Sequence, residues 1–280
     1  CQALSPHLSA FAADRERLRA PFRARPQKRD MRRTVFLTDF SAHASIYPKK
    51  PHILKQILPA ERIFMNLLYL FQTVLNEKYI QLEEETASYS CHLNGDVLYL
   101  FFEWSNGATD WKNNLDFPAK HYREMPDCWY AHRGFLRVWK VIEERLAPVI
   151  NDRKVKRILI AGYSHGAALA LLCHEYCKFN RRDIGNSITG YGFGCPRVAF
   201  GHLRKSVKER FRGFFVIRNK KDIVTHVPPV FLLYRHAGRL ITVGTGRWNC
   251  IDAHRPENYL ESLQDYMQSG AKNWGGKCPP

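Results

Sequence analysis

A serine lies in a sharp-turn pattern near the middle of this 280-residue chain. The apolar run 155–161 leads into Gly162-Tyr163-Ser164-His165-Gly166, and small residues follow, as at the start of a helix. The two glycines permit a tight strand-to-helix turn, which would expose the Ser164 hydroxyl at a helix N-terminus. Backbone N–H groups and the helix dipole favour a developing oxyanion there. The pattern therefore predicts Ser164 as the nucleophile of an acyl transfer.

A serine nucleophile needs a general base, and the base needs an acid that orients it. Asp222 follows the apolar run 213–218, which places it in a loop at the carboxyl end of a predicted strand. His226, His236 and His254 come after it. His254 precedes a predicted helix, and an imidazole in that loop can reach both partners, whereas His236 is the competing base. A solvated turn role for Asp222 and a structural role for either histidine are the alternatives.

Helix and strand patterns alternate from residue 134 onward. The predicted helices are 134–149, 166–178, 200–211 and 257–268, and the predicted strands are 155–161, 187–193 and 213–218. Strands separated by helices pair in parallel through right-handed crossovers, so the pattern predicts an α/β fold with a mostly parallel central sheet and helices on both faces. Active-site groups are expected at the carboxyl ends of such strands.

The region before residue 134 has three features. Apolar residues recur at helical spacing between Ile63 and Leu75, which predicts a core-packed helix. The runs 86–93 and 96–103 flank Asn94-Gly95 and predict a β-hairpin. The segment 104–130 is polar, aromatic and irregular, and its length favours a binding loop or lid.

Positive charge is concentrated near the start of the chain. Lys and Arg total 43 against 26 Asp and Glu, and residues 1–60 hold 12 basic and 4 acidic side chains. We interpret 1–56 as a basic arm, disordered or loosely docked, 57–269 as one α/β domain and 270–280 as a flexible tail. The remaining charge is spread thinly, so we expect no nucleic-acid partner. Peripheral contact of the arm with an anionic membrane surface is the interaction that it favours.

The eight cysteines show neither C-x-x-C pairs nor the density of a disulfide scaffold. Cys173 and Cys177 lie one helical turn apart, but no second Cys or His pair follows at ligand spacing, so we predict free thiols and no metal site. No apolar run reaches the length of a membrane span, and the first residues lack a signal-peptide pattern. These features favour a cytoplasmic location.

Several segments together resemble the class 3 lipases, the fungal-lipase-like branch of the α/β-hydrolases, over residues 85–266. They are Ile158-Leu-Ile-Ala-Gly-Tyr-Ser-His-Gly-Ala-Ala-Leu-Ala170, Gly190-Tyr-Gly-Phe-Gly-Cys-Pro-Arg197, His132-Arg-Gly-Phe135, Arg218-Asn-Lys-Lys-Asp-Ile-Val224 with Pro228, and Tyr234-Arg-His-Ala-Gly238. The resemblance implies an α/β-hydrolase fold with Ser164 as nucleophile, Asp222 as acid and His254 as base. It implies a structural role for His236.

The resemblance also implies an oxyanion hole. In the family a hydroxyl residue in a turn after an early buried strand donates to the oxyanion, and Ser105 corresponds to it here. Glu103 and Trp104 replace the usual Arg and Gly of that turn. The second donor would be the backbone N–H of His165. Three aromatic residues are expected to contact substrate: Trp104, Trp111 and Tyr163.

Residues and resemblance together predict a serine carboxylic-ester hydrolase of the lipase type. It would cleave acyl esters of lipids through an acyl-enzyme, with no cofactor and with a lipid or small ester as substrate. A phospholipase or a polyester depolymerase with the same triad is an alternative. Another is a non-enzymatic basic protein that binds anionic lipid or nucleic acid through residues 15–55.

Overall fold

The computed structural model describes residues 67–82, 88–104, 116–123 and 127–273, with 270–273 as backbone only. All of them belong to the unit Gln56–Pro280. The expected basic arm, 1–56, lies outside the described residues, as does the segment 274–280 of the expected tail. Among the described helices, none combines the length and the apolar composition needed to cross a membrane.

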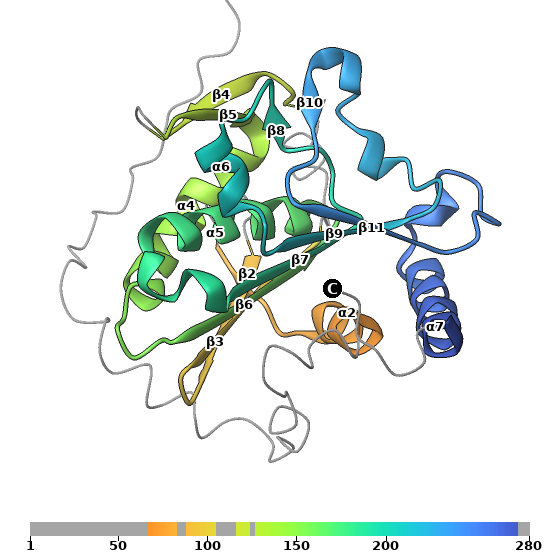
Figure 1. Ribbon diagram of the computed structural model, residues 1–280, viewed down its shortest axis with the longest axis horizontal. Helices are drawn as coiled ribbons and strands as arrows, with labels where there is room; N and C mark the ends of the chain where they lie inside the picture. The colour runs from red at the N-terminus through yellow and green to blue at the C-terminus, as the bar shows by residue number, and fades with distance from the viewer. Residues whose placement is uncertain (1–66, 83–87, 105–115, 124–126, 274–280) are drawn as a thin grey trace, which may run out of the picture. The chain divides into compact units, whose positions relative to one another are not determined.

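A seven-stranded sheet forms the centre of this unit (Figure 1). In spatial order its strands are β1 (Ile80–Gln81), β2 (Ser88–Asn94), β3 (Val97–Phe102), β6 (Arg157–Tyr163), β7 (Ile188–Phe193), β9 (Phe214–Asn219) and β11 (Arg239–Val243). The first three strands are antiparallel, and pairing is parallel from β3 to β11. The predicted α/β fold with a mostly parallel sheet is therefore confirmed.

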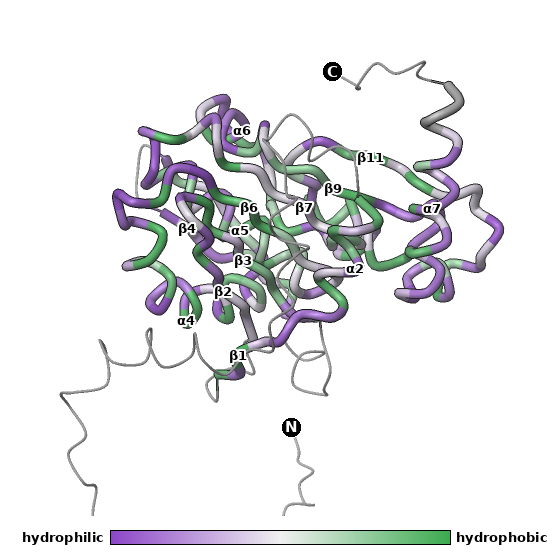
Figure 2. Tube along the Cα trace, turned by 90° about the horizontal axis from the view of Figure 1, so that it is seen from below, coloured by the Kyte–Doolittle hydropathy of each residue, from purple (hydrophilic) through white to green (hydrophobic). Residues whose placement is uncertain are grey.

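Helices cover both faces of the sheet. The helices α4 (Arg133–Ile150), α5 (His165–Asn180) and α6 (Lys205–Arg210) pack on one face, and α2 (Leu67–Asn76) and α7 (Pro256–Asn273) pack on the other. Along β3, Leu98 and Leu100 enter the first core, whereas Tyr99 and Phe101 enter the second. Strands covered on both sides need continuous apolar sequence, and Figure 2 shows hydrophobic residues concentrated on the central strands.

The predicted hairpin is present with its turn moved by one residue. Asn94 pairs with Val97, so the two turn residues are Gly95 and Asp96. Gly95 has φ 61°, a backbone conformation that glycine adopts without a steric cost. Asn94 thus extends β2 instead of entering the turn.

A second, antiparallel sheet was not predicted. Its strands, in order, are β10 (Tyr234–Arg235), β8 (Ala199–Phe200), β5 (Trp129–His132) and β4 (Ala119–Tyr122). The loop interpretation of 104–130 is therefore wrong for 119–122 and 129–130, while 105–115 and 124–126 lie outside the described residues. The predicted helix 200–211 is also too long, because Phe200 pairs with Tyr130 and the helix begins only at Lys205.

Short 3-10 helices complete the described fold: η5 (Arg182–Ser187), η6 (Val224–His226), η7 (Val230–Leu232) and η8 (Asp252–His254). The last helix, α7, continues to Asn273. The expectation of a flexible tail at 270–280 stays a prediction.

A buried carboxylate joins the two layers on the α5 face. Glu175 of α5 has no exposed surface and accepts hydrogen bonds from Arg123, at 2.7 to 3.0 Å, and from Arg210, at 2.7 Å. Arg210 also binds Asp127 at 2.8 Å. The guanidinium group of Arg123 lies 4.1 Å from the centre of the Phe179 ring. The network ties α5 and α6 to the β4–β5 region.

We expect Glu175→Ala to destabilise the protein by about 3–5 kcal/mol, because it leaves the nearly buried guanidinium group of Arg123 without a counter-charge and removes one of the two carboxylates that bind Arg210. Urea unfolding followed by circular dichroism measures this. Glu209→Ala is the matched control, since its partner Arg212 is 70% exposed and such surface pairs contribute at most about 1 kcal/mol. Equal losses in the two variants would contradict the assignment.

Candidate active site

Ser164 occupies a strained turn between β6 and α5. Its backbone has φ 56° and ψ −119°, a conformation that non-glycine residues rarely adopt. The side chain does not cap the helix that it precedes. Its Oγ instead lies 2.8 Å from Nε2 of His254. The strain therefore places a hydroxyl beyond the end of β6, where it meets an imidazole.

The glycines on both sides of Ser164 are required by close backbone contacts. A Cβ on Gly162 would lie 2.2 Å from the carbonyl oxygen of Gly166. A Cβ on Gly166 would lie 2.2 Å from the carbonyl oxygen of Phe102, in β3. No side chain fits at either position, which accounts for the G-x-S-x-G spacing in this sequence.

His254 bridges the serine to a carboxylate. Its Nδ1 lies 2.9 Å from Oδ2 of Asp222, and its Nε2 faces Ser164. Because a carboxylate only accepts, Nδ1 carries the proton and donates to Asp222, which leaves Nε2 as the acceptor for the serine hydroxyl. The structure thus brings together Ser164, Asp222 and His254 from three separate loops. This is the geometry that a serine nucleophile with a histidine base requires.

Asp222 is completely buried, and three donors surround its carboxylate. The backbone N–H of Val224 donates to Oδ1 at 2.9 Å, and the hydroxyl of Tyr259 donates to Oδ2 at 2.5 Å, beside His254. A buried charge is tolerated only when it is paired and hydrogen-bonded in this way. Burial and the neighbouring Asp222 raise the pKa of Tyr259 well above its usual value, so its hydroxyl remains a donor.

Sequence reasoning missed Tyr259. It lies in the first turns of α7, is fully buried and also accepts a hydrogen bond from the backbone N–H of Asn219 at 3.0 Å. In the sequence it is one apolar-face residue of an amphipathic helix. Nothing in that pattern separates it from an ordinary core tyrosine.

Tyr163 packs against the imidazole of His254, and its expected role as a substrate contact stays a prediction. It is 2% exposed, and its ring stacks on that of His254 with centroids 5.1 Å apart and planes 25° apart. Its hydroxyl donates to the backbone carbonyl of His254. On another side, a Cβ on Gly194 would lie 2.9 Å from Cε1 of His254. The ring is therefore held by close packing as well as by hydrogen bonds.

Of the other expected site residues, the structure describes Trp104 and His165 only. Trp104 is half-buried, and its ring centroid lies 6.2 Å from that of Tyr163. His165 is the first residue of α5, so its backbone N–H lies at a helix N-terminus next to Ser164. Ser105 and Trp111 lie outside the described residues. Nowhere in the described part of the chain do three or more His, Cys, Asp or Glu residues form a group that could hold a metal ion.

His236, the competing base, makes its hydrogen bond elsewhere. Its Nε2 lies 2.8 Å from the carbonyl oxygen of Thr225, to which it donates. Burial, and then the positive charges of Arg197 and Arg218, lower the pKa of His236 to about 4. His236 is therefore neutral in the native protein at neutral pH and bonds the loop that follows Asp222.

A family model described as Lipase (class 3) matches residues 99–232. Over this range the chain is similar to the class 3 lipases. The matched range contains Ser164 and Asp222 but ends before His254. The position of His254 in the site is thus given by the hydrogen-bond geometry.

Two curated lipases illustrate how far the similarity extends. The chain is 28% identical over 152 residues to a lipase from Rhizomucor miehei. The aligned stretch covers 51% of this chain and 40% of that protein. It is 26% identical over 142 residues to a secreted mono- and diacylglycerol lipase from Malassezia globosa. That alignment covers 46% of each chain. The chain thus matches less than half the length of these relatives.

Solved lipase structures share the fold. The triacylglyceride lipase of Rhizomucor miehei superposes with a TM-score of 0.52 at 23% identity, covering 59% of this chain and 64% of that one. A lipase from Rhizopus microsporus var. chinensis gives 0.51 at 23% identity, covering 61% and 63%. These matches show that the chain shares the α/β fold of these fungal lipases.

The depressed pKa of His236 predicts a pH-dependent loss of stability. Below about pH 6.5 the unfolded chain protonates this histidine, whereas the folded chain does not until about pH 4. The free energy of unfolding should therefore fall with decreasing pH across this window, by up to about 1.4 kcal/mol per pH unit from this group. His236→Gln, measured by urea unfolding at several pH values, should flatten that slope.

His121→Gln is the control for this experiment, because His121 is exposed and should leave the slope of the parent protein in place. An unchanged slope in His236→Gln would show that His236 is not the group responsible.

Proposed function

We propose that this protein is a serine carboxylic-ester hydrolase that cleaves acyl esters of lipids. The observation that carries the proposal is the continuous hydrogen-bond chain from Ser164 through His254 to the buried Asp222. The match of residues 99–232 to the class 3 lipase model supports the same chemistry.

The proposed reaction begins with proton transfer from Ser164 to His254. Nε2 of His254 takes the proton of the hydroxyl as Oγ forms a bond to the ester carbonyl carbon, and the carbonyl electron pair moves to its oxygen. Asp222 stabilises the resulting imidazolium through the Nδ1–H. Collapse of the intermediate breaks the bond to the alcohol oxygen, which receives the proton from His254. Water then attacks the acyl-enzyme with His254 as base, and this releases the acid and restores Ser164.

The oxyanion would be stabilised at the start of α5. The backbone N–H of His165 lies at the positive end of a 16-residue helix, directly after the nucleophile. Ser105 is the proposed second donor on the basis of the family resemblance. The oxyanion-donor roles of His165 and Ser105 are both part of this proposal.

Exposed apolar side chains next to the triad support a lipid-like substrate. Ile223 follows Asp222 and is 43% exposed, and Ile251 precedes His254 and is 69% exposed. The backbone N–H of Ile223 donates to the carbonyl of Cys250 at 3.0 Å, so the two segments are neighbours. Each Å² of apolar surface covered by an acyl chain would contribute about 25 cal/mol. Contact of the basic arm with an anionic membrane stays a prediction.

Ser164→Ala should lower kcat for hydrolysis of p-nitrophenyl butyrate by about 10⁴-fold or more, since it removes the nucleophile. A fluorophosphonate should label Ser164 in the parent protein, as located by mass spectrometry of peptides. Ser269→Ala, at an exposed position, is the matched control and should keep full activity. Substantial turnover by Ser164→Ala would place the nucleophile elsewhere.

The base assignment separates two histidines. His254→Ala should lose activity to the same degree as Ser164→Ala, whereas folded His236→Gln should retain most of it, because its hydrogen bond goes to Thr225. The opposite ranking would assign the base to His236.

Tyr259→Phe should lower kcat about tenfold with little change in KM, because one hydrogen bond that holds Asp222 is lost. Steady-state kinetics over a range of ester concentrations measures the two constants separately. Tyr266→Phe is the control, since Tyr266 lies on the same helix and is 37% exposed. An unchanged kcat in folded Tyr259→Phe would mean that the remaining donors suffice to hold Asp222.

A further inference from the structure

A second hollow lies at the opposite end of β9 from the triad. It has a volume of about 310 Å³, which lies at the lower end of the range for small-molecule pockets. Phe211 and Arg212, just before β9, and Gly238, just before β11, line it. Asp222 follows the far end of β9, and six strand residues span about 17–20 Å. The hollow is therefore separate from the proposed active site.

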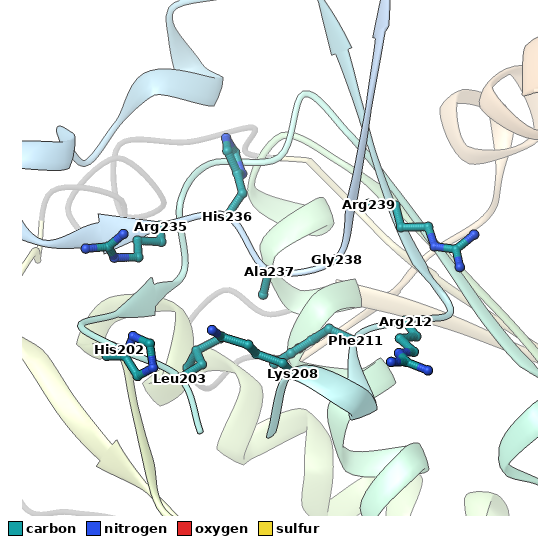
Figure 3. Close-up of a pocket in the computed structure, with 10 residues that line it drawn as sticks. All are labelled: His202, Leu203, Lys208, Phe211, Arg212, Arg235, His236, Ala237, Gly238 and Arg239. Carbon is teal, nitrogen blue, oxygen red and sulfur yellow. The ribbon is translucent and has the colours of Figure 1, made fainter. Parts of the chain in front are cut away.

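The lining of this pocket is basic. Figure 3 shows the lining residues, which come from α6 and the segments on either side of it, from β10, from the start of β11 and from the turn between these two strands. Five have cationic or imidazole side chains placed around the hollow: His202, Lys208, Arg212, Arg235 and Arg239. No acidic residue lines it. His236 also belongs to the lining, but its ring points away from Ala237 and bonds Thr225, so we do not count it as a ligand.

Most of these cations lack a protein counter-charge. Arg212 is paired with Glu209 at 2.7 Å. Among the residues that the structure describes, Lys208 and Arg235 form no ion pair, and Arg239 contacts the ring of Phe215, with its guanidinium carbon 5.9 Å from the centroid. Arg123, by contrast, is neutralised by Glu175. Unpaired like charges around one hollow repel each other, and a bound anion removes that repulsion.

The floor of the pocket is apolar and rigid. Leu203, Phe211 and Ala237 are 6%, 1% and 4% exposed, and all three belong to the core on the α5 face. In Figure 3, Lys208 and Arg235 lie to one side of Ala237 and Arg212 lies to the other, while the guanidinium group of Arg239 points away from Ala237. An occupant can therefore meet cations from both sides while its organic part rests on the floor.

We propose that this pocket binds a small phosphate-bearing anion. Arginine presents paired N–H donors that match phosphate oxygens, and lysine adds a point charge. A phosphate monoester carries more than one negative charge at neutral pH, so it engages cations on both sides of the hollow at once. The phosphate group could belong to a soluble phosphate ester or to a lipid headgroup, which share this chemistry.

Binding to two probes tests the proposal and separates the two sources. Calorimetric titration with glycerol 3-phosphate tests the soluble ester. Co-sedimentation with phosphatidylcholine vesicles, with and without phosphatidic acid, tests the headgroup. Both use the full chain at physiological ionic strength, which suppresses weak contacts of scattered surface charges.

Lys208→Ala/Arg235→Ala is the decisive variant. Both side chains are exposed, so the fold should persist, and thermal unfolding verifies this. The variant should weaken binding of the preferred probe by about tenfold or more, because two charge-assisted hydrogen bonds are lost. Arg153→Ala/Lys154→Ala removes the same charge from an exposed turn before β6 and should bind as the parent protein does.

Each outcome of these titrations decides the matter. Saturable binding of glycerol 3-phosphate that the pocket variant loses identifies a soluble phosphate ester, and loss confined to phosphatidic acid vesicles identifies a headgroup. The proposal is overturned if neither probe binds saturably. It is also overturned if the pocket variant binds as the parent protein does, or if the two variants lose affinity equally, since the effect is then one of net charge alone.

Discussion

The contact of three backbones at the start of α5 sets the geometry on which the rest of the structure depends. Gly166 lies against the carbonyl of Phe102, and Gly162 lies against that of Gly166, with no room for a Cβ at either point. This closeness fixes where α5 crosses β3 and β6. It also forces the intervening Ser164 into a positive φ, because the chain must reverse within a few residues. The small residues Ala167 and Ala168 keep the helix close to the sheet along its first turn.

A buried negative charge sets the second requirement. Asp222 has no contact with water, so its charge must be satisfied by donors that arrive from other parts of the chain. Val224 supplies one from the same loop, and His254 and Tyr259 supply two from the C-terminal segment. The hydrogen bonds that stabilise the buried charge of Asp222 also anchor α7 to the sheet. Stability and site geometry are therefore coupled at this residue.

Local patterns in the sequence were sufficient for a large part of this arrangement. The glycine spacing around Ser164, the hairpin near Gly95 and the alternation of strands and helices each involve residues close in sequence. Two features that depend on distant partners were missed, the antiparallel sheet and the hydrogen bond of Tyr259 to Asp222. Trp129–His132 is short, and its partner β8 lies about 70 residues away. The hydrogen bond from Tyr259 to Asp222 likewise joins residues 37 positions apart, and neither residue type by itself predicts the pairing.

The attachment of α7 has a consequence for the dynamics of the protein. His254 and Tyr259 lie on one continuous segment, η8 and the first turns of α7, that reaches the sheet through Asp222 and Asn219. A segment of this kind can detach in a local opening whose free energy is smaller than that of global unfolding. Such an opening would break the hydrogen bonds of His254 to Ser164 and Asp222 together, while the parallel strands stay paired. Amide hydrogen exchange in α7 would then report the fraction of molecules with an intact site around His254 more closely than the melting temperature does.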